Sequence, residues 1–216
     1  MPMNDFNKEI IDNLEIRLKK ELHGITSHLK MAPLIGDKPY RGFKPPHEFY
    51  SSAVLVLLTA DENNELSFVL TLRSSNLNSH KGQISFPGGK SEFNETPVMT
   101  ALREAKEEIG IAISDVQIIG TLSNLYVPPS NSYITPIVGF LIKKTEFVLN
   151  KQEVEEIIIV PIKTLNDSSK KMFEIWKFNN QDVEVPFWNV HSHTPLWGAT
   201  AMIISEFLDA YNELQK

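Results

Sequence analysis

The sequence contains no cysteine, and this absence excludes disulfide bonds, thiolate metal sites and a cysteine nucleophile. No segment approaches about 18 consecutive apolar residues, the length that a membrane-spanning helix needs. Residues 1–10 also lack the basic region and apolar run of a secretory signal. From these absences we expect a cytoplasmic protein that is neither secreted nor inserted into a membrane, with no membrane partner.

Basic residues are in the minority, because 21 Lys and Arg stand against 27 Asp and Glu and the net charge is −6. This balance argues against a nucleic acid partner, since surfaces that bind polyanions work through clustered positive charge. A small phosphorylated substrate remains compatible, because bound cations reverse the local potential where phosphates sit. With 216 residues and 42% hydrophobic content, the chain can bury a sizeable core.

Residues 89–111 are the most informative segment, a glycine-led loop followed by a predicted helix. Thr96 suits the N-cap, Pro97 suits the first helical position, and Gly110 suits the left-handed position that ends a helix. Helical spacing then places one apolar stripe on the inner face. Its members are Val98, Ala101, Leu102, Ala105 and Ile109.

The opposite face of this helix carries Glu104 beside Glu107 and Glu108, because residues three and four apart are neighbours. Each like-charge pair costs about 0.2–0.5 kcal/mol, and acids in the last turn oppose the helix dipole by about 0.3–1 kcal/mol. A hard divalent cation such as Mg²⁺ or Mn²⁺ is the simplest way to neutralise the cluster. The alternative is an ordinary solvated acidic face.

The same segment resembles the Nudix box, in which a glycine, five residues, Glu and seven residues precede Arg-Glu-aliphatic-x-Glu-Glu-x-Gly-aliphatic. The chain therefore resembles the Nudix hydrolase family. The resemblance implies an α/β (α+β) fold, an α/β/α sandwich around a mixed β-sheet, here at residues 49–216. Residues 1–48 are expected to add an N-terminal helix and a Pro-rich connection. The matching positions are Gly89, Glu95, Arg103, Glu104, Ala105, Glu107, Glu108, Gly110 and Ile111.

A second motif precedes the box and resembles the coenzyme A diphosphatase branch of the family. In that branch Leu-Leu-Thr-x-Arg-Ser, three residues, Arg, three residues and Gly lead into Phe-Pro-Gly-Gly. Val69 stands for the first Leu, and Asn78 stands where the branch has Arg. Losing that guanidinium removes a bidentate phosphate partner. The matching positions are Leu70, Thr71, Arg73, Ser74, Gly82 and residues 86–89.

The resemblance implies that the three helix glutamates bind Mg²⁺ or Mn²⁺, together with the carbonyl of Gly89. Arg103 is expected to hold the glutamates in place and to pair with Glu95. Glu153 and Glu156 are candidates for a general base outside the box, or are exposed loop acids.

Phosphate contacts are expected from Arg73 and Lys81, although a structural ion pair and a solvated loop charge are the alternatives. Gly88, beside Gly89, allows the backbone to approach a ligand closely.

The first functional hypothesis is metal-dependent hydrolysis of the diphosphate bond of coenzyme A or an acyl-CoA, which by resemblance gives 3′,5′-ADP and (acyl-)4′-phosphopantetheine. The second keeps the reaction but takes ADP-ribose, NADH or another nucleoside diphosphate derivative, with Asn78 as its main support. The third is a non-catalytic nucleotide-binding module, which the intact acidic cluster disfavours. A small-molecule diphosphate is the expected partner, and a homodimer is possible.

Outside the box the chain reads as strand-rich, with a helix at each end. The first helix is expected at residues 5–22 with Gly24 as its stop, and the last helix is expected after Gly198. Residues 32–47 are expected to be an irregular connection. Strands are expected at residues 53–59 and 66–72, joined as a hairpin, and at 116–124, 134–142, 156–160, 172–178 and 182–187.

Overall fold

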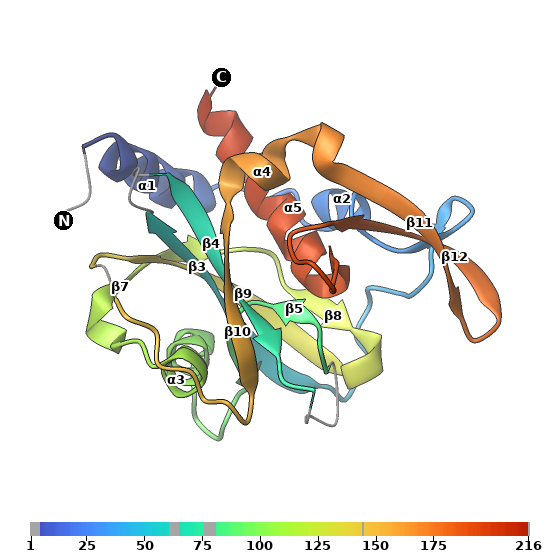
Figure 1. The fold of residues 1–216 in the computed structure, drawn as a ribbon, viewed down its shortest axis with the longest axis horizontal. Helices are drawn as coiled ribbons and strands as arrows, with labels where there is room; N and C mark the ends of the chain where they lie inside the picture. The colour runs from blue at the N-terminus through green and yellow to red at the C-terminus, as the bar shows by residue number, and fades with distance from the viewer. Residues whose placement is uncertain (1–4, 61–64, 76–80, 144, 216) are drawn as a thin grey trace.

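A mixed β-sheet with helices on both faces forms the body of the chain (Figure 1). The computed structural model describes residues 5–60, 65–75, 81–143 and 145–215. Within these ranges no helix is long and apolar enough to cross a membrane. The α-helices are α1 (Asp5–Leu18), α2 (Ile25–Leu29), α3 (Pro97–Ile109), α4 (Ile162–Asn166) and α5 (Gly198–Asn212).

The strands divide into two sheets. In the described residues the main sheet has the strand order β10-β4-β3-β9-β7, and three short strands add to it: β5 pairs with β4, β6 with β3 and β8 with β9. The smaller sheet has the order β11-β12-β1-β2, and β13 pairs with β12. The main-sheet strands are β3 (Tyr50–Ala60), β4 (Leu66–Arg73), β5 (Ile84–Ser85), β6 (Gly88–Lys90), β7 (Val116–Thr121), β8 (Leu125–Val127), β9 (Ser132–Leu141) and β10 (Val154–Pro161). The smaller sheet contains β1 (Leu34–Ile35), β2 (Lys38–Pro39), β11 (Lys171–Phe178), β12 (Gln181–Trp188) and β13 (Leu196–Trp197).

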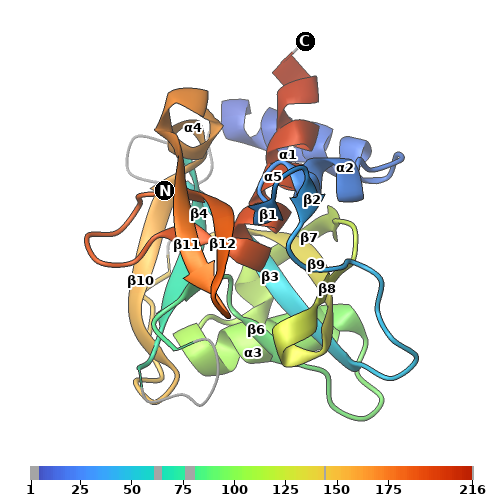
Figure 2. The same ribbon diagram turned by 90° about the vertical axis from the view of Figure 1, so that its right-hand side faces the viewer.

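Strand β3 lies at the centre of the main sheet and belongs to two hydrophobic cores. It pairs antiparallel with β4 and parallel with β9, which makes the sheet mixed. Alternate side chains of a strand point to opposite faces. Leu55 and Leu57 therefore pack in the core with α3, whereas Val56 and Leu58 pack in the core with α1 and α5. Figure 2 shows α3 on one side of the sheet and α1, α2 and α5 on the other.

The smaller sheet extends away from the main sheet as the β11–β12 hairpin (Figure 1). Its turn contains Asn179 and Asn180, both with positive φ, at 49° and 63°. Asparagine tolerates this left-handed region better than most residues. Strand β13 pairs with β12, contacts β5 of the main sheet and leads directly into α5, so the last helix begins where the two sheets meet.

The predicted fold class is confirmed, as are the central helix, the β3–β4 hairpin and the final helix. The hairpin turn, at residues 61–64, lies outside the described residues. The N-terminal helix was predicted too long, because α1 ends at Leu18 and Gly24 instead precedes the short helix α2. Residues 32–47 are not wholly irregular, because they contain β1 and β2. The predicted strand 116–124 ends at Thr121, and a separate strand, β8, begins at Leu125. The division between residues 1–48 and 49–216 stays a prediction.

Candidate active site

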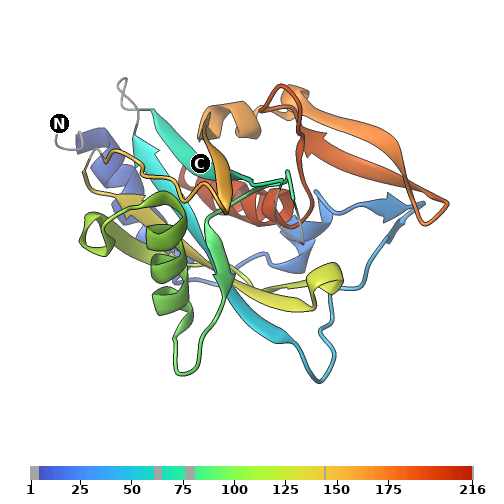
Figure 3. The same ribbon diagram turned by 60° about the horizontal axis from the view of Figure 1, so that its bottom comes forward.

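Helix α3 presents its acidic face to the glycine-rich segment that precedes it, and Figure 3 turns this helix towards the viewer. The Oγ1 of Thr96 accepts a hydrogen bond from the N–H of Met99 at 3.3 Å, and Gly110 ends the helix with φ of 72°. Ala105 and Ile109 are fully buried against the sheet. The caps and the apolar face together fix the rotation of the helix, and so fix where its glutamates point.

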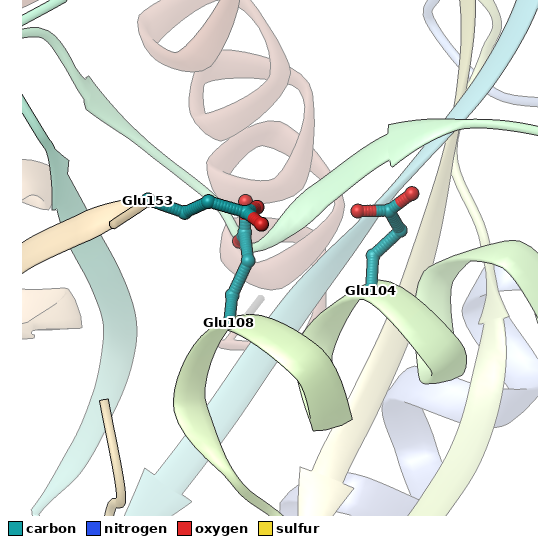
Figure 4. Close-up of side chains that lie close together, drawn as sticks. All are labelled: Glu104, Glu108 and Glu153. Carbon is teal, nitrogen blue, oxygen red and sulfur yellow. The ribbon is translucent and has the colours of Figure 1, made fainter. Parts of the chain in front are cut away.

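Three carboxylates meet beside this helix. Glu104, Glu108 and Glu153 each offer an oxygen, and these oxygens all lie within 4.8 Å of one another. Figure 4 shows Glu104 and Glu108 extending from α3, while Glu153 reaches across from the turn directly before β10. Carboxylate oxygens are the ligands that hard divalent cations prefer, so the residues present fit a Mg²⁺-like or Mn²⁺-like ion.

Glu108 is the most enclosed of the three, with 1% of its surface exposed. Burial raises the pKa of its carboxyl to about 8, and the nearby charges of Glu104 and Glu153 act in the same direction. The Arg73 guanidinium, 3.5 Å away, and a 3.2 Å hydrogen bond from the N–H of Gly88 oppose this shift only in part. A buried carboxylate next to other carboxylates is stable in its ionised form only when positive charge is close by.

Gly88 and Gly89 leave no room for side chains. A Cβ on Gly88 would lie 2.4 Å from the carbonyl oxygen of Ala53, because β6 pairs with β3 at this point. A Cβ on Gly89 would lie 2.5 Å from the carboxylate of Glu104. The missing side chain of Gly88 thus leaves room for β3, and that of Gly89 allows the backbone to lie against the Glu104 carboxylate.

Arg103 organises the outer side of the cluster. Its guanidinium contacts Glu95 at 2.7 and 3.0 Å, Glu104 at 2.9 Å and Glu107 at 3.1 Å, and it donates to the carbonyl of Lys90 at 3.1 Å. The hydrogen bonds from Arg103 are the main reason why the pKa of Glu95 falls to about 2. The predicted pairing of Arg103 with Glu95 is thus present in the structure.

The structure gathers a different set of acids from the one the helix spacing suggested. Glu107 lies outside the three-carboxylate group, with 54% of its side chain exposed, and bonds Arg103. Glu156 also lies outside it, because its side chain faces His191 at 3.3 Å. Glu153, considered from the sequence only as a base candidate, joins the group instead.

Of the residues expected to contact phosphate, Arg73 lies beside Glu108, and Lys81 is exposed on the adjoining turn. The backbone N–H of Gly82 donates to the carbonyl of Arg73 at 3.0 Å, which holds this turn next to the end of β4. Asn78 lies outside the described residues.

The sequence interpretation did not single out Asn150, whose side-chain N–H donates to Glu153 at 3.1 Å. In the sequence, Asn150 is marked only by its position three residues before Glu153, which directly precedes a strand. Such a residue is typical of a turn that bonds its own backbone.

Comparison with known proteins places this arrangement in a family. The family described as NUDIX domain matches residues 49–179. "Nudix hydrolase 3" of Caenorhabditis elegans is 32% identical over 176 residues, which are 74% of this chain and 72% of that protein. "Uncharacterized Nudix hydrolase NudL" of Pectobacterium atrosepticum is 32% identical over 174 residues, which are 76% of this chain and 83% of that protein. The crystal structure of the MutT protein from Methanosarcina mazei Go1 has a similar fold, with a TM-score of 0.51 and 20% identity, covering 81% of this chain and all (100%) of that one.

Proposed function

Because this chain belongs to the Nudix hydrolase family and is a pyrophosphohydrolase, we propose that it hydrolyses the diphosphate bond of coenzyme A or an acyl-CoA. The products would be 3′,5′-ADP and (acyl-)4′-phosphopantetheine, and the cofactor Mg²⁺ or Mn²⁺. We propose a cytoplasmic location and leave a homodimer as a prediction of the sequence.

One observation carries the reaction type: Glu104, Glu108 and Glu153 converge within 4.8 Å at the place where Arg73 and the backbone of Gly88 contact Glu108. Such a site places carboxylate ligands for a metal cation directly beside a positively charged side chain, that of Arg73. Hydrolysis of a diphosphate needs both, because charge on the phosphate oxygens must be neutralised as the bond breaks.

These three glutamates are the proposed cation ligands, with the carbonyl of Gly89 as a further donor. Glu107 is proposed as a further ligand on the solvent-exposed side of the site, where Arg103 holds it beside Glu104. A divalent cation, when bound, neutralises the diphosphate and lowers the pKa of a coordinated water. Arg103 keeps the helix glutamates in fixed orientations through its bonds, and so supports the site without contacting substrate.

Arg73 is the proposed phosphate-binding side chain. Its Nε is buried and has no hydrogen-bond partner in the described part of the chain, although its Nη1 faces Glu108. A buried donor without a partner costs free energy, and a phosphate oxygen would satisfy it. Lys81, exposed on the turn held against Arg73, would bind a more distant phosphate. The backbone of Gly88, whose N–H contacts Glu108, would lie beside the diphosphate.

Glu153 is favoured over Glu156 as the general base. Its carboxylate belongs to the three-carboxylate group proposed to bind the cation, whereas Glu156 contacts His191 and lies outside that group. A base must lie within hydrogen-bond reach of the water that it deprotonates. A carboxylate has two oxygens with about four lone-pair sites, so Glu153 can bind the cation and still accept a proton from the water.

The choice of coenzyme A depends on the motif from Leu70 to Gly89, in which Asn78 departs from the branch. That departure supports a second candidate substrate class, ADP-ribose, NADH or another nucleoside diphosphate derivative. The test is incubation with coenzyme A, acyl-CoA, ADP-ribose and NADH in parallel, with Mg²⁺ or Mn²⁺, and chromatography of the products. We expect 3′,5′-ADP from coenzyme A at the highest rate. Faster turnover of ADP-ribose or NADH would instead establish the second class.

A further inference from the structure

Asn150 joins the end of α3 to the segment that carries Glu153. Its backbone N–H donates to the carbonyl of Glu108 at 3.0 Å, and its carbonyl accepts from the N–H groups of Glu153 and Val154 at 2.9 and 2.8 Å. Its side chain adds two bonds: Oδ1 accepts from the N–H of Gln152 at 3.2 Å, and Nδ2 donates to Oε1 of Glu153 at 3.1 Å. One residue thus bonds the backbone of one clustered acid and the carboxylate of another.

The backbone of this loop is held in place by contacts that do not involve the Asn150 side chain. The N–H of Val148 donates to the carbonyl of Ile109 at 3.0 Å, and a Cβ on Gly110 would lie only 2.7 Å from Val148. These bonds satisfy carbonyls of the last helical turn, which have no partner within a helix. The side-chain bond to Glu153 is therefore separable from the fold of the loop.

We infer that Asn150 is a positioning residue, whose side-chain amide orients the Glu153 carboxylate towards Glu108 so that both can bind one divalent cation. This inference rests on the proposed function. Glu153 is partly exposed and would otherwise sample several rotamers. The amide occupies one direction on Oε1 and leaves Oε2 free. Hydrogen-bond partners of metal-binding side chains typically contribute about 10–100-fold to metal affinity or activity.

The test uses Asn150→Ser in the 216-residue chain. A serine hydroxyl can still accept from the N–H of Gln152, as short polar side chains do at turns, but it does not reach Glu153. The dissociation constant for Mn²⁺ is measured from the electron paramagnetic resonance signal of free Mn²⁺. We expect it to rise about 10-fold. The matched control is Gln152→Ala, which removes an exposed neighbouring side chain and keeps its N–H; we expect a change of less than about twofold.

A double-mutant cycle with Glu153→Ala distinguishes positioning from general loosening of the loop. If Asn150 acts through Glu153, N150S has no further effect on Mn²⁺ affinity in the E153A background. The inference is overturned if N150S lowers Mn²⁺ affinity equally in the wild-type and E153A backgrounds. It is also overturned if E153A binds Mn²⁺ weakly while N150S binds it as tightly as the wild type. Unchanged affinity in E104Q, E108Q and E153A would overturn the proposed metal site itself. Thermal unfolding checks that each variant folds, and Asn150→Ala replaces N150S if the serine variant does not.

Discussion

The carboxylate of Glu108 accepts a hydrogen bond from the backbone N–H of Gly88, with 3.2 Å between Oε2 and the nitrogen. The donor lies on β6, directly before the first residue of the Nudix box, and the acceptor lies on the last turn of α3, so this bond joins the segment before the box to the end of the box helix. It also fixes the orientation of an acid that solvent barely reaches. Glu108 is therefore the residue for which charge, position and burial can be tested most directly.

Glu108→Gln retains the shape of the side chain and removes its charge. We expect kcat/KM for the preferred diphosphate substrate to fall by at least about 10²-fold, because the variant loses an anionic cation ligand in a buried site. The measurement is steady-state turnover with saturating Mg²⁺ or Mn²⁺ on purified protein. Turnover at the wild-type level would show that the proposed mechanism is wrong.

Two other Glu→Gln variants serve as comparisons for this experiment. Glu107→Gln should reduce turnover less than E108Q, because Glu107 is half-exposed and lies outside the three-carboxylate group. Glu155→Gln should have no effect, because Glu155 is an exposed side chain on β10. If turnover fell as far in E107Q as in E108Q, Glu107 would be as important a ligand of the cation as Glu108.

The pH dependence of stability in the metal-free protein is the second prediction. The pKa of Glu108 is raised from 4.5 to about 8, so the folded state favours the protonated carboxyl. Its stabilising contribution is complete below about pH 4.5 and is lost as pH rises towards 8. Since each pKa unit corresponds to about 1.4 kcal/mol, the loss is on the order of a few kcal/mol.

Thermal unfolding in EDTA at pH 5 and pH 8 checks this sign. E108Q imitates the neutral carboxyl at every pH, so it should unfold at a higher temperature than the wild type at pH 8 and at a similar temperature near pH 5. Added Mn²⁺ should raise the unfolding temperature of the wild type more than that of E108Q. A wild type that matches E108Q at pH 8 in EDTA would contradict the raised pKa.

Helix α3 could be predicted from the sequence because its signals are local. Thr96, Pro97 and Gly110 mark its ends, and the apolar period marks its buried face, so the directions of Glu104 and Glu108 follow. The β3–β4 hairpin could be predicted equally well, because both strands are continuous runs of strand-forming residues.

The grouping of Glu153 with these acids could not be predicted in this way. It depends on the bond between Asn150 and the carbonyl of Glu108, which joins segments that no periodicity relates. Strand β6 was missed for a related reason: Gly88 and Gly89 have little intrinsic preference for a strand, and pairing with β3 holds them there. Tertiary contacts decided both features.

Gly89→Ala is the third prediction, and it tests close approach rather than charge. The added Cβ would lie 2.5 Å from the Glu104 carboxylate, so this carboxylate must move. We expect turnover to fall by about 10-fold or more, since small displacements of catalytic groups are costly. Gly42→Ala is the matched control, because a Cβ there meets nothing within 4 Å. Equal turnover in the two variants would show that the position of Glu104 is unimportant.

The last prediction concerns a buried acid far from the candidate active site. Glu206 of α5 is 1% exposed and accepts hydrogen bonds from the backbone N–H of Gly24 at 2.8 Å, from Ser123 at 3.0 and 2.6 Å, and contacts His28 at 3.2 Å. Burial alone would raise the pKa of this carboxyl, but the bonds from His28, Ser123 and Gly24 outweigh burial and lower it. The acid thus ties α2 and the segment after β7 to the last helix.

Glu206→Gln should lower the free energy of unfolding by roughly 2–3 kcal/mol at pH 7, because an amide cannot accept all of these bonds and turns a donor towards other donors. The contribution of Glu206 is present above its unfolded pKa, about 4.5, and is lost as pH falls through its lower folded pKa. Urea unfolding at pH 7 and again near pH 3 measures both effects. The difference between wild type and E206Q should shrink at the lower pH while turnover per folded molecule at pH 7 stays the same. A difference that is constant with pH would mean that the ionised form of Glu206 does not stabilise the fold.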